Sequence, residues 1–371
     1  MNPQRIPLNM NMTLSEPQTT PMMNVRRHDI DTLRTIALTL LIFYHCAVSF
    51  QPWGGYFGFP VNSPSFEAIG PAMAMISVWR IPLLFLVSGM GVCFAMERRG
   101  WLGLIKERSV RILLPWLFGI CLLNPLFGWL MPKLGWHEAY AIQFGHLWFL
   151  LNIYLYALWF VGVLIYFKNE PDNVVLRFLR RAINWPLGLY LFAVPYVIEA
   201  AVVRPQYFAL FVDTVHGWLL GVVCFVMGFV FVSLKEDFWR AAARTRWVAL
   251  AVGVALFLVR LLVYHLENYS NALMALESVS WIYALLGFAS LYLNRPSRVL
   301  SYCSKAVFPV YIVHMPVQFV LAHFLFPTGL GAPTKFVLLT VGTLAVSVAI
   351  YQFILRYTWW MKPLWGIKLK G

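Results

Sequence analysis

An arginine and a histidine stand eleven positions apart in the first apolar segment of the chain, at Arg34 and His45. Ionisable side chains at membrane depth are costly unless they are paired or functional, so both are candidates for a site. On an α-helix, eleven residues make almost three turns, which places the two side chains on one face and about 16 Å apart along the axis. The spacing predicts a cation near one membrane surface and a titratable imidazole further inside, as in a site reached from two sides.

Composition indicates the class of protein in which these residues lie. The chain of 371 residues is 60% hydrophobic and only 12% charged, a balance that no soluble core of this length requires. We therefore predict an all-α polytopic membrane protein. Apolar runs long enough to cross a hydrocarbon layer of ~30 Å predict ten transmembrane helices, near residues 32–52, 70–96, 112–132, 147–167, 184–203, 208–233, 247–264, 274–293, 306–326 and 335–357.

The positive charge of the chain follows from membrane topology. The net charge of +14 could suggest a nucleic-acid partner, but with a cytoplasmic N-terminus nearly all cations fall into the connections on one side. The opposite connections hold only Lys133, Arg204 and Lys335, as the positive-inside rule requires. Both termini are therefore predicted to be cytoplasmic, and the expected partners are membrane lipids and not nucleic acid.

Three segments are predicted along the chain. Residues 1–25 are expected to form a disordered cytoplasmic leader, since they contain no apolar run followed by a small-residue cleavage site. Residues 26–361 are expected to form the membrane domain, and residues 362–371 a basic cytoplasmic tail. The five cysteines lack the spacing of metal ligands, so neither a metal site nor a disulfide framework is predicted.

Two pairs of arginines follow the second apolar segment, Arg98 with Arg99 and Arg108 with Arg111. Arg108 and Arg111 are three residues apart and therefore neighbours on one helical face. The guanidinium group offers a fork of donors that suits phosphate, so an anion such as the nucleotide part of coenzyme A would fit this cluster. Alternatively, these are ordinary cytoplasmic-side cations in contact with anionic lipid.

The second apolar segment itself contains Arg80, followed by a proline and by the small pair Ser88 and Gly89. This pattern indicates a kinked, closely packed helix with a cation facing the interior of the bundle. Arg80 either contacts a substrate or forms a buried ion pair with a carboxylate such as Glu277 or Glu67.

Two further histidines belong to later apolar segments. His146 and Trp148 open the fourth segment, where the histidine could hold a sugar or act as a second acid–base group, while the tryptophan fits the interfacial aromatic belt. In the ninth segment, Tyr311 precedes His314, which by itself fits an interhelical hydrogen bond better than catalysis. Glu277 is a candidate for orienting a histidine ring. Other ionisable residues lie near segment ends and can reach the interface: Glu199, Asp213 and Arg260.

Five motifs, taken in chain order, resemble the bacterial acyltransferase-3 family of integral membrane O-acyltransferases. They are Asp31-x-x-Arg34 with ten residues before His45, Phe85-Leu-Val-Ser88-Gly89, Arg108-x-x-Arg111 before Pro115, His146-Leu-Trp148-Phe149, and Tyr311-Ile-Val-His314. The resemblance runs from the first predicted span to the ninth. Trp79-Arg80, together with Glu277-Ser278, looks most like the branch that contains the glucan-succinylating membrane protein.

This resemblance implies transfer of an acetyl, succinyl or similar group from cytoplasmic acyl-CoA to a hydroxyl of a periplasmic or extracellular glycan, lipid-linked sugar or small molecule. It implies a multi-pass protein of the bacterial cytoplasmic (inner) membrane, with acyl-CoA as co-substrate and no bound cofactor. Because no soluble hydrolase-like domain is appended, the membrane domain is expected to reach the acceptor directly.

The resemblance also implies roles for the motif residues. His45 would act as general base on the acceptor hydroxyl, or would be acylated and pass the group on. Arg34 would orient the donor or balance charge as the thiolate leaves, and Arg80 would contact the thioester carbonyl or an acyl carboxylate. The implied phosphate-binding residues are Arg98, Arg99, Arg108 and Arg111. The implied supporting residues are Asp31, Ser88, His146, Trp148, Glu277, Tyr311 and His314.

Two interpretations from other classes stay open at this stage. A transporter or flippase for a glycan or lipid-linked intermediate could line a polar pathway with His45, Arg34 and Glu277, since ionisable residues mark pathways as readily as active sites. Against it, the sequence shows no repeated half that would indicate inverted symmetry. A structural partner in a glycan-synthesis complex would tolerate replacement of His45. The sequence does not determine the acyl group, the acceptor or the oligomeric state.

Overall fold

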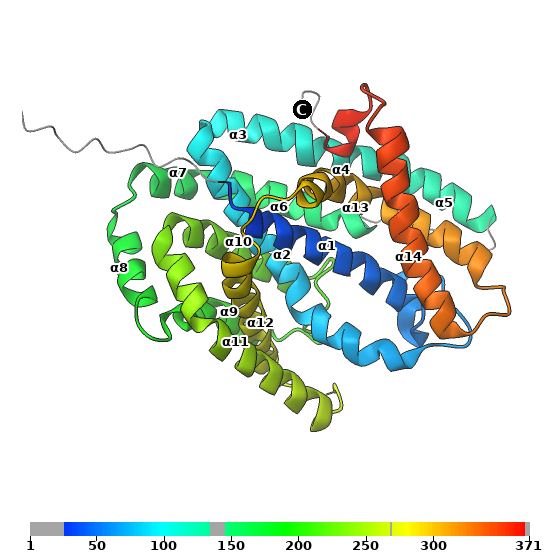
Figure 1. Cartoon of the computed structure of the whole chain (residues 1–371), viewed down its shortest axis with the longest axis horizontal. Coiled ribbons are helices and arrows are strands. Elements are labelled where there is room, and N and C mark those ends of the chain that lie inside the picture. Colours follow the sequence, from blue (N-terminus) through cyan, green and yellow to red (C-terminus); the bar gives the residue numbers. More distant parts are fainter. Residues whose placement is uncertain (1–25, 134–144, 268, 368–371) are drawn as a thin grey trace, which may run out of the picture.

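The structure is a computed structural model that describes residues 26–133, 145–267 and 269–367, and the regular elements in these ranges are all helices (Figure 1). The predicted leader and the last residues of the predicted tail lie outside the described residues. The α-helices are α1 (His28–Val48), α2 (Gly70–Arg98), α3 (Trp101–Arg108), α4 (Leu114–Phe118), α5 (Asn124–Lys133), α6 (Trp148–Trp159), α7 (Val161–Asn169), α8 (Val174–Ile183), α9 (Val194–Val203), α10 (Val215–Ser233), α11 (Glu236–Leu262), α12 (Asn271–Tyr292), α13 (Arg298–Leu325) and α14 (Ala332–Ile350). The predicted all-α class is confirmed.

The predicted spans and the helices agree segment by segment, with two differences. Eight helices in the described ranges are long and apolar enough to cross a membrane. The fourth predicted span is broken at Phe160 into α6 and α7, which are bent by 56°. The fifth, Gly188–Val203, is shorter than the ~20 residues that a helix needs to cross the hydrocarbon layer. The described ranges therefore contain eight candidate spans, or nine with the bent pair, instead of the ten expected.

Helix α2 packs against α1, α10 and α12 and forms the centre of the bundle. Its contact with α10 brings backbone against backbone. A Cβ atom on Gly89 would stand 1.9 Å from the Phe225 carbonyl oxygen, and one on Gly228 would stand 1.9 Å from the Leu86 carbonyl oxygen. Helices approach this closely only where residues are small. Ser88, beside Gly89, donates its hydroxyl to a carbonyl of its own helix at 2.7 Å.

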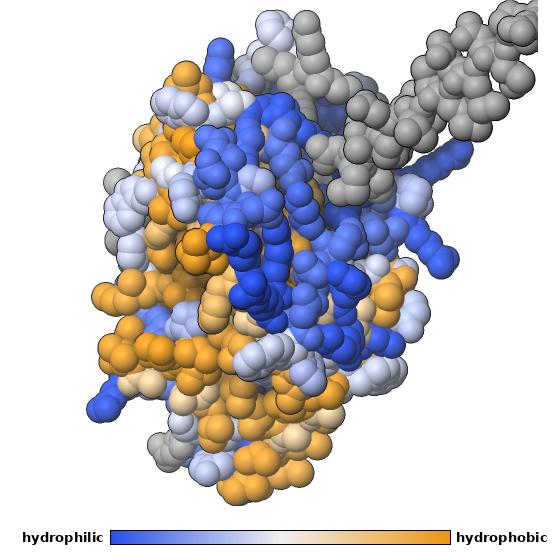
Figure 2. Space-filling model, turned by 90° about the vertical axis from the view of Figure 1, so that its left-hand side faces the viewer, coloured by the Kyte–Doolittle hydropathy of each residue, from blue (hydrophilic) through white to orange (hydrophobic). Residues whose placement is uncertain are grey.

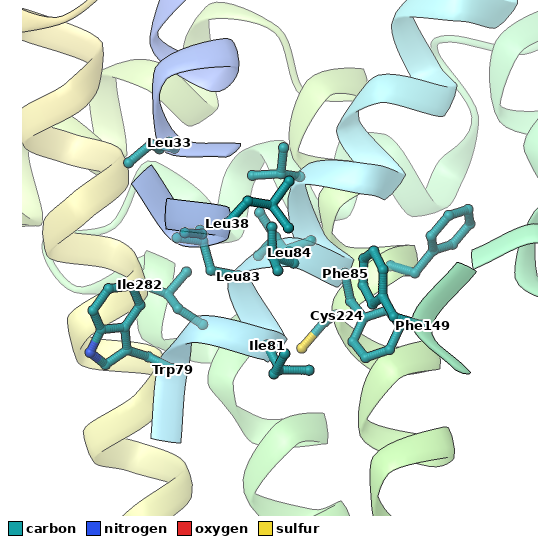
Figure 3. Close-up of a cluster of buried hydrophobic side chains, with 14 of the residues drawn as sticks. Leu33, Leu38, Trp79, Ile81, Leu83, Leu84, Phe85, Phe149, Cys224 and Ile282 are labelled. Atoms are coloured by element: carbon teal, nitrogen blue, oxygen red, sulfur yellow. The ribbon is translucent and has the colours of Figure 1, made fainter. Parts of the chain in front are cut away.

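Apolar side chains from several helices fill the interior beside α2. Figure 3 shows Leu38 of α1, Leu83 and Leu84 of α2, Phe149 of α6 and Cys224 of α10 in one buried cluster. On the outer face in Figure 2, broad hydrophobic areas lie beside a gathering of hydrophilic residues. Hydrophobic areas of this extent suit helices whose outer sides face lipid.

Two buried polar pairs join helices within the bundle. Arg260 of α11 donates to both carboxylate oxygens of Glu277 in α12, at 2.8 and 2.7 Å, and also to the Ala74 carbonyl of α2. Nδ1 of His216 in α10 lies 2.9 Å from the carboxylate of Glu199 in α9. Their sequence positions suggested that Glu199 and Arg260 reach the interface, but both are buried because each has a partner on a neighbouring helix.

Candidate functional site

Two histidines from different helices meet at the centre of the candidate site. The rings of His45 in α1 and His314 in α13 stack at 5.2 Å between centroids, and Nδ1 of His45 lies 2.9 Å from Nε2 of His314. His314 is fully buried, whereas His45 is partly exposed and lines a cavity. Of these two rings, His45 is the one that a substrate can reach.

For two neutral rings, the hydrogen bonds assign the tautomers of this pair. Nδ1 of His314 lies 2.6 Å from the Tyr311 carbonyl oxygen, which can only accept, so Nδ1 carries the hydrogen. Nε2 of His314 is then an acceptor, and His45 donates to it through its own Nδ1–H. Nε2 of His45 is left with a free lone pair, and it has no hydrogen bond in the part of the chain that the structure describes. This is the protonation state that a general base requires.

His146 lies against the same pair, in the 3₁₀ turn Gly145–Leu147 that precedes α6. Its ring meets the His314 ring edge to face at 5.1 Å, and its Nε2 lies 3.1 Å from the Ile312 carbonyl oxygen. The hydroxyl of Tyr311 donates to the backbone carbonyl of His146. The predicted motif residues of the fourth and ninth spans therefore converge on one site with His45.

Arg80 of α2 is a buried cation that has no carboxylate partner among the described residues. Its guanidinium group stacks on the Tyr44 ring at 4.1 Å, and its Nε and Nη1 have no hydrogen-bond acceptor among the described residues. The ion pair with Glu277, one of the alternatives for Arg80, is not formed, because Arg260 occupies both carboxylate oxygens of Glu277. For the same reason Glu277 does not orient a histidine. Arg80 lines the cavity beside His45 instead.

The cavity above these residues has a volume of about 550 Å³. Residues 53–61, which follow α1, and residues 209–213, which precede α10, form much of its wall. Trp148 also lines the cavity and packs edge to face on Phe85 at 5.8 Å, so it belongs to the site. Asp213 stands in the wall, where desolvation raises the pKa of its carboxyl.

A cluster of arginines lies at the other end of α1. A Cβ atom on Gly91 of α2 would stand 3.3 Å from Nη2 of Arg34 and 3.9 Å from Nη2 of Arg108, so the two guanidinium groups converge over this glycine. Asp31 lies 3.7 Å from Arg34, whose charge it partly balances. Nε of Arg108 is buried without an acceptor among the described residues. Here a ligand with several negative charges would find unpaired donors.

The other predicted phosphate-binding residues border this cluster. Glu107 accepts a hydrogen bond from Arg111 at 3.1 Å and another from Arg99. Arg98, Arg99 and Arg111 are all exposed, whereas Arg108 is only partly so. The cluster therefore has a partly exposed centre, formed by Arg34 and Arg108, and an exposed rim.

The two parts of the site lie at opposite ends of an antiparallel helix pair. Arg34 of α1 meets Gly91 of α2, while Tyr44, next to His45, meets Arg80, which precedes Gly91 by eleven residues. Each helix thus spans about 16 Å between the arginine cluster and the histidine cavity. Leu38 of α1 and Leu83 and Leu84 of α2, which stand between these positions in the two helices, are buried in one apolar cluster (Figure 3). The two-sided layout predicted from the spacing of Arg34 and His45 fits this arrangement.

Sequence reasoning missed one residue of the site, Gln318 of α13. Its fully buried amide Nε2 donates to the His45 backbone carbonyl at 2.9 Å and to the Ser49 hydroxyl at 3.1 Å. Carbonyl groups in the last turn of a helix lack helical hydrogen-bond donors, and the Gln318 amide is such a donor for the last turn of α1. The available signal was its position four residues after His314, on the same face of the helix.

Fold and site together define a multi-pass membrane protein with a histidine cavity and a separate arginine cluster. A scan against protein-family models matches residues 27–352 to the acyltransferase domain of the acyltransferase-3 family. The chain therefore belongs to this family and is a membrane acyltransferase. Searches of curated proteins and of solved structures gave no match. The glucan-succinylating branch stays a prediction.

Proposed function

We propose that this protein transfers an acyl group from cytoplasmic acyl-CoA to a hydroxyl group of a glycan, lipid-linked sugar or small molecule on the opposite side of the bacterial cytoplasmic membrane. The observation that carries this proposal is the bare Nε2 of His45, which lines a cavity at the end of α1 remote from the arginine cluster. A base and a polyanion site at opposite ends of one helix suit two substrates that arrive from two sides.

The arginine cluster is the proposed site for the phosphates of coenzyme A. Arg34 and Arg108 converge over Gly91, and Arg111 lies at the exposed rim. Charge-assisted hydrogen bonds from guanidinium to phosphate are short and strong, and the paired donors of arginine match two phosphate oxygens at once. The thioester arm would then extend alongside α1 and α2 toward His45.

Transfer is proposed to occur in one step at His45. The acceptor hydroxyl gives its proton to Nε2, its oxygen bonds to the thioester carbonyl carbon, and the carbon–sulfur bond breaks. The proton then passes from His45 to the departing coenzyme A thiolate. Arg80, with unpaired donors beside His45, would stabilise the negative charge that develops on the carbonyl oxygen. Removal of one donor of this kind typically lowers kcat by about 10²–10³.

The test is mass spectrometry of glycans, lipids and small molecules from matched cells that lack the protein or carry the wild type, His45→Ala or His323→Ala. His323 lies on α13 and does not line the cavity, so it is the matched control. We expect an acyl-sized mass shift with the wild type and His323→Ala only, at equal protein levels in the membrane. Equal modification with His45→Ala would remove His45 from the chemistry, and altered glycan export without any acylation would indicate a transporter.

A further inference from the structure

A proline-interrupted turn of α13 determines the hydrogen bonds of the two histidines that line the cavity. Pro316 has no N–H to offer to the Ile312 carbonyl, and Nε2 of His146 lies 3.1 Å from that oxygen. The neighbouring carbonyl, of Tyr311, accepts the hydrogen bond that fixes the His314 tautomer. Two adjacent carbonyls on one turn of α13 therefore orient His146 directly and His45 through His314.

The bond to Ile312 determines which nitrogen of His146 is free. A carbonyl oxygen can only accept, so Nε2 of the neutral ring carries the hydrogen and Nδ1 keeps its lone pair. No hydrogen bond to Nδ1 is formed by the residues that the structure describes. The ring lines the cavity, and the Tyr311 hydroxyl holds its backbone in place. The cavity is thus bordered by two histidines that each have one bare nitrogen.

We propose that Nδ1 of His146 accepts a hydrogen bond from a second hydroxyl of the acceptor while Nε2 of His45 takes the proton of the hydroxyl that is acylated. This inference rests on the proposed function. Two bare acceptor nitrogens at one cavity match a molecule with at least two O–H donors, and a molecule with a single hydroxyl would leave His146 unsatisfied. The acceptor is therefore a molecule with at least two hydroxyl groups, and His146 is a specificity-determining residue.

Two amide substitutions separate a binding role from a structural one. In His146→Asn the side-chain amide reaches the place of Nδ1, whereas in His146→Gln it reaches the place of Nε2 and can keep the bond to Ile312. His146→Asn keeps an acceptor at the place of Nδ1 but loses the bond to Ile312, so we expect the initial rate of product formation in cells, at equal membrane levels, to fall about fivefold. His146→Gln leaves a hydroxyl of the bound acceptor without a partner, so we expect a larger fall, about fiftyfold. The reverse order, or equal loss in both, would overturn the proposal.

A substitution in α13 tests whether Pro316 leaves the Ile312 carbonyl free for His146. Pro316→Ala restores an N–H that competes with His146 for the Ile312 carbonyl, so product formation should fall about fivefold, the scale of a weakened hydrogen bond. Pro309→Ala, in the same helix but outside the cavity, is the matched control and should keep the wild-type rate. Equal rates for the two variants would contradict the role of this turn.

Tandem mass spectrometry of the wild-type product tests the acceptor class. The acylated molecule should carry at least one free hydroxyl besides the oxygen that bears the acyl group, and an acceptor with a single hydroxyl would refute the inference. Failure of the proposed function has a different signature, because the wild type itself would then give no acylated product.

Discussion

At the scale of single residues, two buried arginines with different surroundings suggest different functions. Arg260 donates to Glu277 at 2.7 and 2.8 Å, while Nε and Nη1 of Arg80 have no acceptor among the described residues. A paired buried cation is part of the framework of the bundle. An unpaired one beside a cavity is available to a substrate, and this difference was invisible in the sequence.

This contrast gives opposite expectations for the matched variants Arg80→Met and Arg260→Met. Arg260→Met leaves Glu277 buried without its partner, so the free energy of unfolding should fall by about 3–5 kcal/mol. Arg80→Met leaves no carboxylate unpaired, so the protein should unfold at nearly the wild-type temperature but transfer acyl groups about 10²-fold more slowly. Thermal unfolding in detergent and product mass spectrometry measure the two effects. Equal destabilisation by both variants would show that Arg80 is also structural.

Gln318 is a positioning residue, because it holds the backbone of His45 and does not line the cavity. Gln318→Leu should lower kcat about tenfold and leave the KM for the acceptor nearly unchanged, since the base moves but the binding walls do not. Gln51→Leu is the matched control, because Gln51 is also buried and donates one hydrogen bond, to the Phe66 carbonyl. Transfer kinetics in membranes, with the acceptor that mass spectrometry identifies, measure the change in kcat and KM. A loss confined to KM would argue against a positioning role.

At the scale of elements, the contact between α2 and α10 fixes the position of the helix that carries Arg80. This contact depends on glycine, since a Cβ on Gly89 would overlap the Phe225 carbonyl oxygen. Helix α13 positions His45 itself. His314 accepts a hydrogen bond from the His45 ring, and Gln318 donates one to the His45 backbone carbonyl. The site is therefore assembled by helices that are distant in the sequence.

We expect Gly89→Ala to force α2 and α10 apart and to lower the free energy of unfolding by about 1–3 kcal/mol, the usual cost of an overpacked contact. Gly100→Ala is the control, because a Cβ at that position meets no atom within 4 Å. The midpoints of thermal unfolding in detergent should separate the two variants. If Gly89→Ala were as stable as Gly100→Ala, the backbone contact would not limit stability.

At the scale of the whole molecule, the arginine cluster and the cavity mouth are expected to face opposite sides of the membrane. Tyr56, 92% exposed at the cavity wall, and Lys106, exposed on α3, report on the two ends. In a background with Cys121→Ser and Cys303→Ser, which removes the two cysteines that are not buried, a membrane-impermeant maleimide should label Tyr56→Cys in intact cells. It should label Lys106→Cys only after the membrane is made permeable. Labelling of both from outside would contradict the two-sided site.

Much of this architecture follows from the sequence alone, because the necessary information is local. Apolar runs identify membrane helices whatever their neighbours are, and the count differs only where Phe160 breaks one span and Gly188–Val203 is too short. The spacing of Arg34 and His45 gives their separation, because helix geometry is nearly constant. The ordered motifs were sufficient to identify the family.

The tertiary structure decided which side chains meet, because partner choice depends on which helices are neighbours and how each is rotated. His45 and His314 are 269 residues apart in the chain, and no local pattern pairs them. Glu277 could have faced Arg80 or a histidine, but the packing of α12 on α11 places its carboxylate against Arg260. That choice left Arg80 unpaired at the cavity, where a buried charge without a partner favours an incoming substrate.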